Sequence, residues 1–411
     1  MPPRFSRAAP WLVLLLVAVL ALAGAWSITL AIDLPSGHDF NLAGWEVRHL
    51  GGKWLYQVGR LFRGDLSEQE QDATVARFLT LNARVAELEH RLAQPRASAA
   101  DTSATQAALR QRRRERDALE NDVEAILEER LSRVASDAGL ESSLPLFPGL
   151  TWLFPPVDTE FDAPPRVLVL SPRDRIFLES QRPLRHDLTL KEILRLEEEQ
   201  EARGLSALVV QIGGAATYPS VVQPTADYQY TLEMVAHEWL HHYLFFKPLG
   251  RRYFQSEELT TLNETVADMA GRELAALVAE RYPLKLNTHP QEETEPSDSL
   301  DLGRELRSLR LKVERLLEQG RVEEAEALME ERRRFLEAHG LYIRKINQAY
   351  FAFYGVYADT PASISPIGPK LAELRRRSPS LGEFIRTAAL LTSEEDLDRL
   401  LAQEASALTQ P

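Results

Sequence analysis

The sequence predicts a mostly helical α+β protein with a small mixed sheet, flanked by helical hairpins. Three observations support this fold class. Apolar residues recur every three or four positions over long stretches before residue 145 and after residue 300. Short β-branched runs such as Ser206–Ile212 lie between them. Hydrophobic residues make up 44% and charged residues 27% of the sequence, which is typical of a globular chain. Its length of 411 residues is enough for two or three domains.

An uncharged, apolar segment, Trp11–Ile32, lies near the N-terminus. Its 22 residues are long enough for a helix to cross ~30 Å of hydrocarbon. Arg4 and Arg7 precede it and acidic residues follow, so the positive-inside rule places the N-terminus in the cytoplasm. We therefore expect residues 1–33 to anchor a single-pass membrane protein with an extracytoplasmic body. The alternative is a signal peptide cleaved among the alanines at 21–25, which would make the protein secreted.

The next region, residues 34–145, is predicted to contain a coiled-coil-like helical hairpin. Helices are expected over 67–94 and 105–137, separated by a break that contains Pro95. The apolar positions that define them are Phe78, Leu81, Val85, Leu88 and Leu92, then Leu119, Val123, Ile126, Leu127, Leu131 and Val134. A spacer is the simplest interpretation of this hairpin, and self-association through residues 67–137 is the second.

A proline-rich stretch separates the hairpin from a core region at 150–285. Thr189-Leu190-Lys191-Glu192 is a capping box that begins a helix, which we expect to end at Gly204. Pro219 favours an edge position for the last extended piece. Strands are expected at Arg166–Leu170, Ile176–Leu178 and Ser206–Ile212, an extended piece at Thr217–Val222, and two further helices at 228–247 and 256–281.

The last region, residues 286–411, is predicted to be helical. A polar linker leads into a helical hairpin that turns at Gly320. An aromatic helix is expected over 341–357, followed by a charged helix near the C-terminus.

Composition excludes some classes of function. The formal net charge of −13 argues against a nucleic-acid-binding protein, which would present a basic face. Cysteine is absent, so the chain has no disulfides, no thiolate nucleophile and no cysteine metal ligand. Any metal must be bound by His, Asp or Glu.

The segment His237-Glu238-Trp239-Leu240-His241 predicts a zinc site. Histidines four apart on a helix leave the same face, so both imidazoles can bind one Zn²⁺. Glu238 projects about 100° around the helix, where it can act as general base towards a zinc-activated water. The alternative is that His241 and His242 are simple surface histidines on an amphipathic helix.

A third ligand is expected on the following helix, in Leu262-Asn263-Glu264-Thr265-Val266-Ala267-Asp268. Packing of this helix against the first would bring Glu264 to the two histidines. Asp268, one turn further on, can accept the remaining imidazole N–H of a ligand histidine. Glu257, Glu258 and His289 stay open as alternative third ligands.

The combination of HEWLH and NETVAD resembles the thermolysin-type metallopeptidases, the gluzincins, whose motif is HExxH followed by NExx(S/A)D. The resemblance covers residues 205–280. It implies a zincin-like core, with His237, His241 and Glu264 as ligands of one Zn²⁺ and Glu238 as the catalytic base. It also implies that Asn263 and Asp268 support the ligands, and that the extended piece 214–222 pairs with the substrate backbone.

The segment 346–359 is faintly similar to the C-terminal "NNA…Y" part of predicted bacterial aminopeptidases. By this similarity Asn347 would contact substrate and Tyr357 would stabilise the oxyanion, whereas Gln348 departs from the pattern. The alternative is that these aromatic residues belong to the core. The GAMEN motif of aminopeptidases is absent, so exopeptidase and endopeptidase action both stay open.

These patterns predict a membrane-anchored, extracytoplasmic zinc peptidase that acts on peptides or proteins. The alternative is an envelope scaffold whose hairpins bind partners and whose metal site is structural or vestigial. Structural zinc sites have four protein ligands, whereas this motif supplies three and leaves one position for water.

Overall fold

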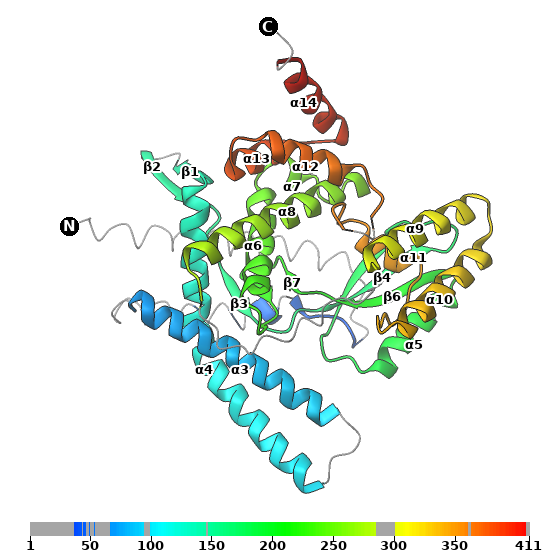
Figure 1. The fold of residues 1–411 in the computed structure, drawn as a ribbon, viewed down its shortest axis with the longest axis horizontal. Coiled ribbons are helices and arrows are strands. Elements are labelled where there is room, and N and C mark those ends of the chain that lie inside the picture. Colours follow the sequence, from blue (N-terminus) through cyan, green and yellow to red (C-terminus); the bar gives the residue numbers. More distant parts are fainter. Residues whose placement is uncertain are drawn as a thin grey trace.

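The computed structural model describes residues 37–42, 44–46, 49, 53, 66–93, 99–144, 147–284, 301–360 and 363–407. Over these ranges the protein is a mostly helical α+β structure with small sheets, as the sequence predicts. Helices α6 (Tyr228–Phe245) and α8 (Glu257–Arg281) lie side by side near the centre of the molecule (Figure 1).

The expected N-terminal anchor, residues 1–33, lies outside the described residues. Among the helices that are described, none combines the length and the apolar character needed to cross a membrane.

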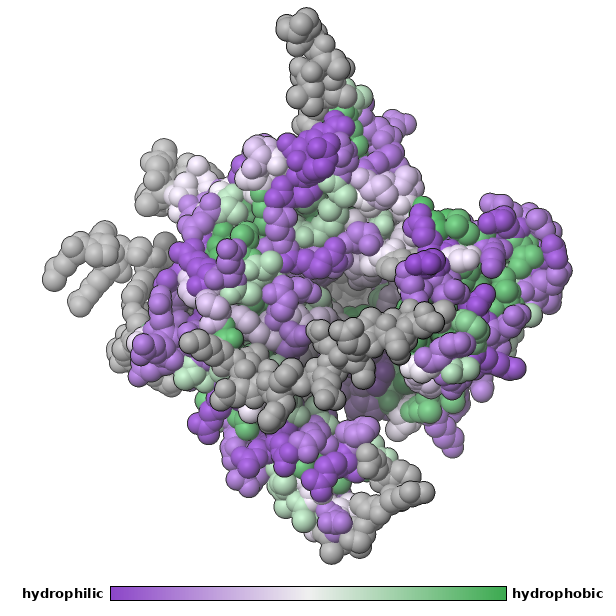
Figure 2. All heavy atoms as spheres, in the orientation of Figure 1, coloured by the Kyte–Doolittle hydropathy of each residue, from purple (hydrophilic) through white to green (hydrophobic). Residues whose placement is uncertain are grey.

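The first region forms an antiparallel hairpin of α3 (Glu68–Ala93) and α4 (Ala99–Asp137), as expected. The free end of this hairpin projects from the rest of the molecule and is mainly hydrophilic on the face drawn (Figures 1 and 2). Between its two helices, Val85, Leu88 and Leu109 are buried. At the other end, residues such as Phe78 and Leu131 share one core with α6 and α8. The apolar seam is thus buried within the chain, and self-association stays a prediction.

A three-stranded antiparallel sheet holds β4 (Arg166–Pro172) between β5 (Ser180–Leu184) and β6 (Leu205–Gln211). Helix α5 (Leu190–Glu201) begins with the predicted capping box and covers one face of this sheet. Helix α11 (Gln348–Tyr354) covers the other face, because Val167, Val169, Leu208 and Val210 pack against Ala349 and Phe353.

The strand expected at Ile176–Leu178 is wrong, because the second strand is β5, a few residues later. Ile176 packs against the helices that follow residue 301, and Leu178 packs beside α11, so their apolar side chains serve contacts between elements. The β5 sequence is polar and mostly exposed, as suits an edge strand, and it therefore lacks the apolar alternation that a strand prediction requires.

A second small sheet lies next to α6. In it β8 (Ser220–Val222) is central, with β3 (Thr159–Phe161) parallel on one side and β7 (Gly214–Ala215) antiparallel on the other. The edge position expected for the piece around Pro219 is therefore wrong. Pro219 precedes β8, and the edge strand on that side is β7. A separate hairpin pairs β1 (Glu141–Leu144) with β2 (Phe147–Leu153).

The two central helices begin at side-chain caps. Asp227 accepts the N–H of Tyr230 at the start of α6, and Ser256 accepts the N–H of Leu259 at the start of α8. The short helix α7 (Pro248–Arg251) turns the chain between them. Where the helices cross, Gly271 faces the α6 backbone so closely that a Cβ there would lie 3.1 Å from the backbone nitrogen of His237.

The C-terminal part is helical, as expected. Helices α9 (Leu302–Glu318) and α10 (Val322–Ala338) form a hairpin that turns at Gly320, whose φ of +72° favours glycine. Helices α12 (Ile367–Arg377), α13 (Leu381–Ala388) and α14 (Glu394–Ala407) pack on α8.

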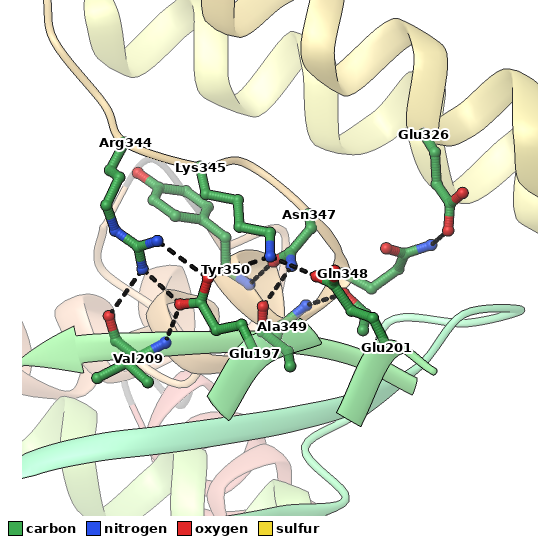
Figure 3. Close-up of polar contacts among 12 residues, drawn as sticks. Glu197, Glu201, Val209, Glu326, Arg344, Lys345, Asn347, Gln348, Ala349 and Tyr350 are labelled. Carbon is green, nitrogen blue, oxygen red and sulfur yellow. Dashed lines mark hydrogen bonds and ion pairs between the residues drawn. The ribbon is translucent and has the colours of Figure 1, made fainter. Parts of the chain in front are cut away.

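The aromatic helix expected over 341–357 is only seven residues long, as α11. Arg344 and Lys345 form ion pairs with Glu197 of α5, which hold the preceding chain on the sheet (Figure 3). Asn347 then caps α11 by accepting the N–H of Tyr350. The residues before Asn347 are therefore not helical, because Arg344 and Lys345 are held by Glu197, and the predicted helix begins only at Gln348.

We predict that Gly271→Ala will not stabilise the protein. Glycine to alanine inside a helix normally gains about 0.8–1.0 kcal/mol. Here the added Cβ meets the α6 backbone, so the gain should vanish or reverse, and Gly271→Val should cost ~1–3 kcal/mol. Thermal unfolding of the metal-free protein measures both changes. A full gain for Gly271→Ala would contradict the close helix contact.

Candidate metal centre

Two histidine side chains leave α6 towards α8, one helical turn apart. The Nε2 atoms of His237 and His241 lie 3.1 Å from each other. The two rings meet edge to face, with centroids 4.7 Å apart. The spacing read from the sequence therefore places both nitrogens at one point.

Glu264 reaches the same point from α8. Its Oε2 lies 3.5 Å from the Nε2 of His237 and 3.5 Å from that of His241. His237 and Glu264 are buried, with 7% and 6% of their surface exposed. Of the acids considered as third ligands, Glu264 is the one that the structure brings to the two histidines.

Other side chains orient two of these groups. The Nδ1 of His241 lies 2.9 Å from the Oδ1 of Asn263, which is buried on α8. When the amide oxygen accepts this N–H, the neutral ring keeps its Nε2 lone pair free for a metal. The phenol of Tyr253, in the loop before α8, donates to the Oε1 of Glu264 and leaves Oε2 towards the histidines. No spacing in the sequence pointed to Tyr253.

Asp268 lies one turn beyond Glu264, and its carboxylate pairs with Arg272. Burial and the charge of Asp359 raise the pKa of Asp268, whereas the charges of Arg272 and His237 lower it. The Nδ1 of His237 is buried without a hydrogen-bond partner among the described residues. Among the described residues, Asn263 therefore contacts the Nδ1 of one candidate ligand histidine, whereas no hydrogen bond joins Asp268 to the Nδ1 of the other.

Charges within this group shift the pKa values of Glu264 and His241. Burial raises the pKa of Glu264, but the charges and hydrogen bonds of His241 and His237 outweigh it and hold that pKa well below its usual range. Burial lowers the pKa of His241, but Glu264 outweighs it and raises the value to about 9. Without a metal, His241 therefore retains a proton below a pH of about 9.

The three groups fit a metal ion. Tetrahedral zinc with ligands at 2.0–2.1 Å requires ligand atoms about 3.3 Å apart. The observed separations of 3.1 and 3.5 Å lie on either side of this value. The group His237, His241 and Glu264 could therefore hold a metal ion, and among the described residues it contains no fourth protein ligand.

Glu238 is buried next to this group. A Cβ on Gly214 would lie 2.5 Å from its Oε1, so the carboxylate rests directly against the backbone of β7. Burial raises the pKa of Glu238, while the charges of His237 and His241 lower it. A glycine in β7 thus makes room for a carboxylate beside the three candidate ligands.

Tyr357 and Asn347 have different surroundings. The ring centroids of Tyr357 and His237 lie 6.3 Å apart. Burial, together with the charges of Glu264 and Glu238, raises the pKa of Tyr357 well above its usual range. Asn347 instead lies on the sheet, where its amide donates to the carbonyl of Ala207 at 2.9 Å (Figure 3). Its amide oxygen caps α11.

The other candidate ligands lie elsewhere or outside the described residues. Glu258 accepts the backbone N–H of Glu394, and His289 is not described. Burial raises the pKa of Glu257, while the charge of Arg310 lowers it. A second group, Glu120, Glu124 and Glu160, could also gather round a metal. Lys53 already lies beside it, with Nζ 3.7 Å from Glu124, and balances part of its charge.

Comparison of the chain with models of known protein families, with curated proteins and with solved structures found no match.

We predict that Glu264→Ala will weaken zinc binding by more than ~100-fold, because it removes a ligand and not merely a partner of one. The free zinc concentration at half-saturation and the stoichiometry of the metal measure this change. Glu257→Ala is the matched control on the same helix and should keep one zinc per chain. Equal losses in the two variants would move the third ligand away from Glu264.

We also predict that zinc binding near neutral pH releases a proton. The pKa of His241 is raised to about 9, so this ring is protonated below that pH and must lose its proton to bind a metal. Apparent affinity should therefore rise up to tenfold per pH unit between about 7 and 9. Calorimetry in buffers of different ionisation enthalpy measures the released protons, and a pH-independent affinity would contradict the retained proton.

Proposed function

We propose that the protein is a zinc-dependent peptidase that hydrolyses peptide bonds with Glu238 as general base. The observation that carries this proposal is the convergence of the His237, His241 and Glu264 ligand atoms beside the buried carboxylate of Glu238. The arrangement supports the resemblance of the HEWLH and NETVAD segments to the gluzincins, with a zincin-like core.

The proposed division of work follows from these positions. Bound zinc would supply a Lewis acid that acidifies water and polarises a carbonyl. Glu238, held between β7 and the ligands, would take the proton of the attacking water and return it to the leaving amine. Tyr357 would donate a hydrogen bond to the developing oxyanion.

The substrate would be a peptide or protein in extended form. Strand β7 is an edge of its sheet and lies against Glu238, so it offers backbone groups close to the reacting atoms. We also propose, from the sequence alone, that the N-terminal segment anchors the protein in a membrane and that its catalytic part is extracytoplasmic.

A scaffold protein with a structural metal site is the alternative. A closed structural site needs four protein ligands, and the described residues bring together three. In a structural site, a general base such as Glu238 beside an open coordination position would have no water to activate. We therefore favour the peptidase.

We expect Glu238→Gln to retain zinc and to lower hydrolysis by ~10²–10⁴-fold, because the amide cannot accept the proton of water. The release of new amino groups from casein detects both endopeptidase and exopeptidase cleavage, and metal analysis verifies the zinc. Glu233→Gln is the control on the same helix, since Glu233 accepts a hydrogen bond from Gln229 and lies one turn before His237. Full activity in Glu238→Gln would overturn the general-base role.

A further inference from the structure

The chain that follows α11 is tied to α8 immediately next to Tyr357. The Oγ1 of Thr265 accepts the backbone N–H of Ala358 at 2.9 Å. Thr265 is completely buried and directly follows Glu264 on α8. A single hydrogen bond therefore joins the residue after the third candidate ligand to the residue after Tyr357.

A backbone N–H can only donate, so the Thr265 hydroxyl is the acceptor in this hydrogen bond. The Thr265 hydroxyl has one proton, and it lies 2.6 Å from the carbonyl oxygen of Thr261 one turn earlier, which accepts that proton. The oxygen lone pairs are then left for the Ala358 N–H. Among the described residues this buried backbone N–H has no other hydrogen-bond partner, which makes the contact costly to lose.

A second tie lies two turns further along α8. Arg272 pairs with Asp359 and also with Asp268. The two residues that follow Tyr357 are thus both bound to the helix that carries Glu264. Asn347, at the start of α11, is held to the sheet (Figure 3). The segment that carries Tyr357 is therefore tied at both of its ends.

We propose that Thr265, assisted by Arg272, is a positioning residue that holds the phenol of Tyr357 at the metal centre. The proposal rests on the peptidase function proposed above and adds how the oxyanion-stabilising group is aligned. Helix α8 then has two roles, because it supplies a ligand through Glu264 and fixes the opposite wall of the site through the next residue.

A purely structural Thr265 would behave differently from a positioning residue. Loss of a structural hydrogen bond lowers stability whether or not Tyr357 has its hydroxyl. Loss of a positioning bond acts through Tyr357, so its effect should disappear when the Tyr357 hydroxyl is already absent. Thr265→Ser retains the hydroxyl that donates to Thr261 and accepts from Ala358, so this variant should keep the activity that Thr265→Val loses.

The first measurement uses the full-length, zinc-loaded protein and amino-group release from casein. We expect Thr265→Val to lower kcat by ~10–100-fold, with KM changed less than ~3-fold and one zinc per chain retained. Thr265→Ser should stay within ~3-fold of the parent, and Thr265→Val combined with Tyr357→Phe should be no slower than Tyr357→Phe alone. Thr231→Val is the matched control, because that buried threonine on α6 also donates to a helix carbonyl.

The second measurement does not depend on hydrolysis. Visible absorption of the cobalt(II)-loaded protein reports the surroundings of the metal, so Thr265→Val and Tyr357→Phe should shift the bands alike, and the double variant no further. Independent shifts, an unchanged spectrum in Thr265→Val, or equal losses in Thr231→Val would overturn the proposal. A parent protein with these cobalt shifts but no casein cleavage would contradict the peptidase while leaving Thr265 as the residue that positions Tyr357.

Discussion

The close contact of α6 with α8 is the constraint on which the candidate metal centre depends. One helix can offer two histidines a turn apart, but it cannot offer the third group to the same point. Glu264 and Gly271 are seven residues apart and therefore share one face of α8. Gly271 lets that face approach the backbone at His237, and the approach is what places Glu264 at 3.5 Å from both imidazoles.

The contact between α6 and α8 also buries the Glu264 carboxylate beside two histidines, and the surrounding residues hydrogen-bond these groups. A buried carboxylate is costly unless it is paired and hydrogen-bonded. Glu264 has the histidines on one oxygen and Tyr253 on the other, and His241 has Asn263. The raised pKa of His241 means that a proton balances the carboxylate when no metal does. A divalent cation would replace that proton at the same point without moving either helix.

Much of this arrangement could be predicted from sequence, because it depends on local periodicity. The hairpins, the capping box at Thr189 and the common face of His237 and His241 follow from helical spacing. Tyr253 could not be found this way, because its partner lies on a different element and no fixed spacing joins them. The shift of the second strand to β5 and the shortening of α11 have the same cause, since ion pairs and packing with distant residues determined them.

The boundary drawn from the sequence near residue 285 separates groups that the structure brings together. Tyr357 belongs to the C-terminal region, yet α11 packs on β4 and β6, and the chain after it is bonded to α8. A core that ended at residue 285 would contain the three candidate ligands and Glu238 but would lack the phenol and would expose the apolar face of the sheet that Ala349 and Phe353 cover. The proposed metal binding and the proposed alignment of Tyr357 are therefore separable, since the first would depend on α6 and α8, and the second would also require the C-terminal region to be folded onto them.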